Sequence, residues 1–78
     1  MSRNLLHKTK LEAFKVWLDG HGVEHRPGRG DFQVLQVLVP RSGWQVVYDR
    51  IQAPEHYTVP KPLESLTLKF VRSKHAHN

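Results

Sequence analysis

The spacing of apolar residues near the N-terminus predicts one amphipathic helix over residues 10–20. Its apolar residues recur every three or four positions, on one stripe of a helix. They are Leu11, Phe14, Trp17 and Leu18. Thr9 and Glu12 have the spacing of a capping box that would begin the helix. Gly20 and Gly22 would end it, because glycine adopts the left-handed C-terminal conformation without a Cβ clash.

The middle of the chain has the pattern of β-structure. Residues 32–39 and 44–51 are rich in β-branched and aromatic side chains and flank the turn-forming segment 40–43. This arrangement is typical of a β-hairpin. Residues 56–59 predict a third strand. Residues 63–70, just after Pro62, carry leucines and a phenylalanine at helical spacing, but they also alternate. A second helix and a fourth strand therefore both stay open there.

The predicted order of elements is α-β-β-β-α, which indicates an α+β fold. A three-stranded antiparallel sheet with two helices on one face satisfies this order. With 78 residues the chain is expected to form one small domain. Within it we expect a basic N-terminal arm or helix extension over 1–8, a folded body over 9–72 and a frayed tail over 73–78.

The strand register decides which residues enter the core. A four-residue loop at 40–43 places three cross-strand pairs on the core face. The pairs are Val39 with Trp44, Val37 with Val46, and Leu35 with Tyr48. The opposite face would stay uncovered although more than half of it is apolar, which is typical of a partner surface. The candidate protein-binding residues are Phe32, Val34, Gln36, Leu38, Gln45, Val47 and Ile51. We therefore expect a protein partner or a homo-oligomer.

Charge suggests a second class of ligand. The net charge is +5, and it lies at the ends: residues 1–10 and 61–78 each carry +3, whereas residues 11–60 carry −1. Basic segments attract phosphate backbones. The alternative prediction is therefore nucleic-acid binding through the basic ends. The candidate residues are Arg3, Lys8, Lys10, Lys69, Arg72 and Lys74.

The sequence predicts no enzyme, metal site or cofactor. There is no cysteine, which excludes disulfides and thiolate ligands. His21 and His25 are four residues apart, as zinc ligands on a helix can be, but a segment rich in glycine and proline holds them. His56 has no serine or paired carboxylate placed beside it by the sequence. No apolar run is long enough to span a membrane and the N-terminus does not resemble a signal peptide, so a cytoplasmic location is expected.

Two resemblances accompany these patterns. Over residues 10–72 the α-β-β-β-α order resembles double-stranded-RNA-binding modules and HicA-type toxins, which are small basic ribonucleases. His56-Tyr57-Thr58-Val59-Pro60 is similar to the toxin strand before the last helix, whereas Trp44 stands where those toxins carry the catalytic histidine. The tryptophan-bearing hairpin with a His-x-Thr-Val strand also resembles small bacteriophage proteins that bind a host protein. Because Trp44 replaces that histidine, we expect a non-enzymatic binding module, with a protein or a nucleic acid as its partner.

Overall fold

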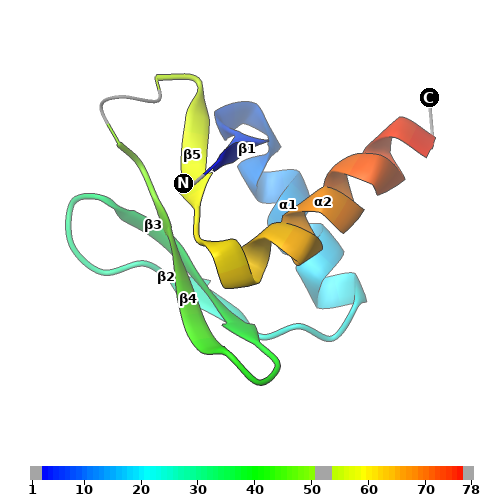
Figure 1. The fold of residues 1–78 in the computed structure, drawn as a ribbon, viewed down its shortest axis with the longest axis horizontal. Coiled ribbons are helices and arrows are strands. Elements are labelled where there is room, and N and C mark those ends of the chain that lie inside the picture. The colour runs from blue at the N-terminus through cyan, green and yellow to red at the C-terminus, as the bar shows by residue number, and fades with distance from the viewer. Residues whose placement is uncertain (1–2, 51–53, 77–78) are drawn as a thin grey trace.

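Both helices lie on one side of a five-stranded antiparallel sheet (Figure 1). The structure is a computed structural model that describes residues 3–50 and 54–76. In chain order the elements are β1 (Arg3–His7), η1 (Lys8–Lys10), α1 (Leu11–Gly20), β2 (His25–Pro27), β3 (Gln33–Val39), β4 (Gly43–Tyr48), β5 (His56–Val59) and α2 (Lys61–Ala76). The strands are ordered β1-β5-β4-β3-β2 across the sheet. The α+β class is confirmed, but the sheet has five strands rather than three.

The two additional strands form the edges of the sheet. β1 pairs with β5, so residues 3–7 form a strand where an arm or a helix extension is expected. β2 has three residues and pairs with β3. It lies in a segment whose prolines and glycines predict an irregular connection. Pro27 suits an edge strand, because proline has no N–H to donate to a neighbour.

The core lies between the sheet and the two helices. Its side chains come from both helices and from every strand except β2. They are Leu6, Phe14, Leu18, Leu35, Val37, Val39, Val47, Val59, Leu63 and Phe70. The aromatic rings of Phe14 and Phe70 join α1 to α2, with centroids 5.1 Å apart. Trp17 packs against the same cluster, as the helical stripe predicts.

Each helix differs from its expected form at one end. Thr9 does not cap α1: the helix is preceded by Lys10 without a side-chain cap, and the Thr9 N–H donates to Nδ1 of His7 instead. The segment after Pro60 is a helix rather than a fourth strand. α2 continues to Ala76, beyond residue 73, where fraying is expected. Thr67 is buried in it and donates its hydroxyl proton to the Glu64 carbonyl at 2.9 Å, which satisfies the hydroxyl.

The expected register of the hairpin is wrong by one residue. Val39 pairs with Gly43, not with Trp44, so the loop contains three residues rather than four. The Ser42 N–H donates to the Val39 carbonyl at 3.0 Å, and both Arg41 and Gly43 have positive φ. Proline at the second turn position with positive φ at the third is the pattern of a type II turn. Because side chains alternate along a strand, this shift turns every side chain of β4 to the other face.

No helix in the described part of the chain is long and apolar enough to cross a membrane.

Candidate functional site

The helices leave one face of the sheet uncovered, and we call it the open face. Along β2, β3 and β4 its residues alternate with residues that point toward the helices. They are Arg26, Gln36, Leu38, Trp44, Val46 and Tyr48. Cross-strand pairing sets them in rows: Leu38 lies opposite Trp44, and Gln36 lies between Arg26 and Val46. The open face is thus a mixed surface of aromatic, aliphatic and basic side chains.

An arginine covers the tryptophan of the open face. The Arg26 guanidinium carbon lies 3.9 Å from the centroid of the Trp44 ring, a close cation–π contact. Arg26 Nε also donates to the Gln36 side-chain carbonyl, and the Gln36 amide donates to Gln33 at 3.0 Å. This chain of contacts accounts for the burial of Gln36, which is 6% exposed, on a face without a covering helix. Trp44 remains 37% exposed.

A second arginine–aromatic pair lies at the other end of β4. The Arg50 guanidinium carbon is 5.2 Å from the centroid of the Tyr48 ring. Tyr48 is opposite Thr58 of β5. Arg29, exposed in the loop before β3, donates its backbone N–H to the Gln33 side chain at 3.0 Å. Arg26, Arg29 and Arg50 form no ion pair within residues 3–50 and 54–76, so their charges face solvent uncompensated.

The candidate protein-binding residues divide between the two faces. Gln36 and Leu38 lie on the open face as expected. Val47 does not: it is fully buried in the core, and Gln45 is opposite Val37 on the helix side. Val34 lies at a bulge in β3 and packs against the core. Phe32, just before β3, is 59% exposed and remains a candidate, while Ile51 lies outside the described residues.

The candidate basic residues at the ends of the chain lie outside β2, β3 and β4, the strands that carry the open face. Lys8 makes an ion pair with Asp49 at 2.9 Å, which compensates both charges. Lys10 is exposed in η1. Lys69 and Arg72 are exposed on α2, on the helix side of the sheet (Figure 1). Of the remaining two, Arg3 belongs to β1 and Lys74 to the last turns of α2.

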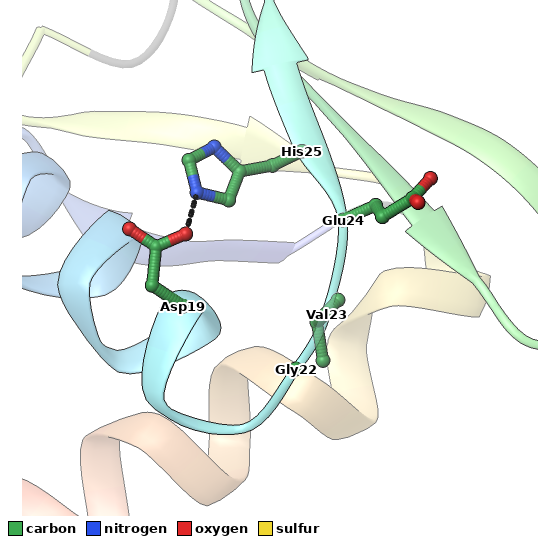
Figure 2. Close-up of a pocket in the computed structure, with 5 residues that line it drawn as sticks. All are labelled: Asp19, Gly22, Val23, Glu24 and His25. Carbon is green, nitrogen blue, oxygen red and sulfur yellow. Dashed lines mark hydrogen bonds and ion pairs between the residues drawn. The ribbon is translucent and has the colours of Figure 1, made fainter.

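Two pairs of polar side chains could take part in proton transfer. Figure 2 shows His25 pointing to Asp19 at the end of α1, with 2.8 Å between Nε2 and Oδ1, beside a cavity of about 450 Å³. The cavity lining is Asp19, Gly22, Val23, Glu24 and His25, which includes no hydroxyl nucleophile. The contact between His25 and Asp19 joins β2 to the end of α1.

The second pair joins two neighbouring strands. His7 and His56 lie opposite each other on β1 and β5, with ring centroids 5.0 Å apart. Thr9 engages Nδ1 of His7 through both its N–H and its hydroxyl oxygen. Among the residues that the structure describes, no three histidine, aspartate or glutamate side chains gather as a metal site.

The functional candidates that sequence reasoning missed are Arg26, Trp44, Tyr48 and Arg50. The signal that could have found them is Gly43. A glycine directly after a Pro-x-Ser segment fits the left-handed position that follows a three-residue loop, and that loop length sets the register. Comparisons of the chain with protein-family models, with curated proteins and with solved structures found no match.

Proposed function

We propose that this protein is a non-enzymatic module that binds single-stranded nucleic acid on its open face. The observation that carries the proposal is the cation–π contact of Arg26 with Trp44, with Arg50 and Tyr48 as a second such pair. Both aromatic residues belong to β4. Proteins that bind single strands combine exposed aromatic rings, on which bases stack, with basic groups that hold the phosphates. The observed register brings both features to the open face.

The arginines are suited to this role in two ways. A guanidinium donates paired hydrogen bonds to phosphate oxygens and also stacks on a base. Arg26 uses Nε to bind Gln36, which orients the side chain while its two terminal amino groups remain as donors. An arginine held in place by packing loses less entropy when a ligand binds.

A protein partner is supported less well. That expectation depends on a broad aliphatic surface, but Val47 belongs to the core and Val34 packs against it. Among the described residues of β2, β3 and β4, the aliphatic side chains on the open face are Leu38 and Val46. A duplex held by the basic ends is also supported less well, because Lys8 is paired with Asp49 and Lys69 lies on α2.

The test is a titration of a labelled oligouridylate, its DNA counterpart and a duplex of equal length, read by fluorescence anisotropy. Arg26→Ala is compared with Arg72→Ala, which removes the same charge from α2. We expect Arg26→Ala to weaken single-strand binding about tenfold. It should also lower the salt slope between about 50 and 200 mM by about 0.7. Arg72→Ala should change affinity less than about twofold.

Three results would contradict the proposal: equal losses in the two variants, tighter binding of the duplex, or no binding of either single strand. A comparison of the single-strand affinities of Trp44→Ala and Trp44→Phe tests the proposal independently. The phenyl ring keeps a stacking surface, so only the alanine variant should lose about tenfold in affinity. If Val46→Glu instead abolishes a dimer seen in sedimentation while no oligonucleotide binds, the open face is a protein interface.

A further inference from the structure

A cavity of about 410 Å³ reaches the open face at Leu38. Its lining is His21, Gly22, Val23, Glu24, Leu38 and Pro40. Leu38 belongs to both features, because it forms part of the cavity wall and is the cross-strand neighbour of Trp44. The cavity is therefore continuous with the surface that we propose to bind bases.

Glu24 supplies the carboxylate of this cavity. Its backbone carbonyl accepts from the Leu38 N–H at 2.9 Å, which sets Glu24 beside Leu38 and in one row with Trp44. Figure 2 shows the Glu24 side chain pointing away from the His25–Asp19 pair. The side chain is exposed and makes no hydrogen bond or ion pair with the described residues. Glu24 thus brings an unengaged carboxylate to a cavity whose lining includes the apolar residues Val23, Leu38 and Pro40.

We infer that this cavity receives one base of the bound strand and that Glu24 selects guanine there; the inference rests on the proposed function. A carboxylate has two acceptor oxygens side by side and no donor. Guanine presents two adjacent N–H donors on its Watson–Crick edge, which match the two oxygens. Adenine and cytosine present an amino group next to an acceptor nitrogen. Uracil presents one N–H between two carbonyl oxygens. The negatively charged carboxylate repels these two oxygens.

Contact with the apolar side chains of Val23, Leu38 and Pro40 strengthens this discrimination. A polar edge that is desolvated against an apolar wall without a matching partner loses its hydrogen bonds to water and gains none. Adenine, cytosine and uracil cannot donate to both carboxylate oxygens, so their binding is weakened. Discrimination of about tenfold per well-matched base contact is usual in nucleic-acid recognition.

The experiment uses oligouridylates with a single central guanosine, adenosine or cytidine, together with the unsubstituted oligomer. Wild-type protein is compared with Glu24→Gln and with the matched control Glu12→Gln. Glu12 is an exposed carboxylate on α1, on the other side of the sheet. We expect wild type and Glu12→Gln to prefer the guanosine oligomer about tenfold. Glu24→Gln should lose that preference and bind plain oligouridylate about twofold more tightly, because a negative charge near the phosphates is removed.

The outcomes separate the two proposals. If wild type binds all four oligomers equally, the guanine site is wrong while the single-strand function stands. If Glu24→Gln keeps the preference, another group reads the base and the inference is also wrong. If no oligomer binds wild type, the proposed function fails and the guanine site fails with it. Circular dichroism of each variant confirms that the fold is intact.

Discussion

Val46 and Val47 are adjacent residues of β4 that meet opposite environments. Val47 is fully buried against Leu35, its cross-strand partner, whereas Val46 is half-buried on the open face beside Gln36. The two side chains are identical, so a difference in their response to substitution reports only on their environment. A charge at Val47 would be buried without a partner, and a charge at Val46 would reach water.

We expect Val47→Glu to unfold the protein and Val46→Glu to leave it folded with weakened single-strand binding. An unpaired buried charge costs several kcal/mol, comparable with the total stability of about 5 kcal/mol for a domain of this size. The acid at position 46 would instead repel phosphates on the open face. Circular dichroism and thermal unfolding of both variants test the register directly. A folded Val47→Glu variant beside an unfolded Val46→Glu variant would show that β4 faces the other way.

At the scale of elements, the N-terminal segment differs most from the expected fold, because Arg3–His7 form the strand β1. It closes the sheet against β5 and brings Leu6, which is fully buried, into the core. The sequence predicts a role for the charge of this segment, whereas the structure shows that Leu6 anchors it in the core. An N-terminal arm without contacts would tolerate truncation, whereas a strand that fills the core does not.

Leu6→Ala therefore tests whether β1 is part of the fold. We expect the free energy of unfolding to fall by about 2–5 kcal/mol, because the substitution leaves a cavity between β5 and the helices. The control is Val16→Ala on α1, where the side chain is 70% exposed. It should change stability by less than about 0.5 kcal/mol. Chemical denaturation measures both, and equal small changes would mean that residues 3–7 do not pack as a strand.

At the scale of the whole molecule, the sheet separates two surfaces of different composition. The helix side carries Lys69 and Arg72, and the open face carries Arg26 and Trp44. The net charge of +5 is shared between them, so net charge alone does not tell which surface binds a polyanion. Only removal of charge from one surface at a time answers that question.

Deletion of residues 73–78 removes Lys74, one of the candidate basic residues of the C-terminal end, while keeping Leu63 and Phe70, core residues of α2. If the open face is the site, single-strand affinity should stay within about twofold of wild type and the salt slope should be unchanged. If the basic residue at the C-terminal end contributes to binding, both the single-strand affinity and the salt slope should fall. Gel shifts over a range of salt concentrations measure the two quantities, and thermal unfolding of the truncated protein serves as the control.

Local sequence patterns predicted the type of most elements. The helical stripe from Leu11 to Leu18 and the β-branched runs around Val37 and Val47 lie where the helix and strands form. β5 begins and ends where the sequence predicts. These patterns are reliable because a helix or strand buries one face, and the spacing of apolar residues along the chain records that face.

Only the tertiary structure decided which residues belong to the candidate site. The turn at Arg41 and Gly43 pairs Val39 with Gly43, and that single step moves Trp44 to the open face and Val47 to the core. β4 is apolar on both faces, so its composition does not distinguish the two registers, whereas the turn geometry and the packing of Val47 against the helices do. The edge strands were likewise unpredictable, because a short strand is stabilised by the partner it pairs with rather than by its own residues. The sequence by itself determined the first helix, the hairpin and the α+β class. The choice of helix over strand after Pro62, the register, the edge strands and the arginine–aromatic pairs of the open face depend on contacts between residues distant in the chain.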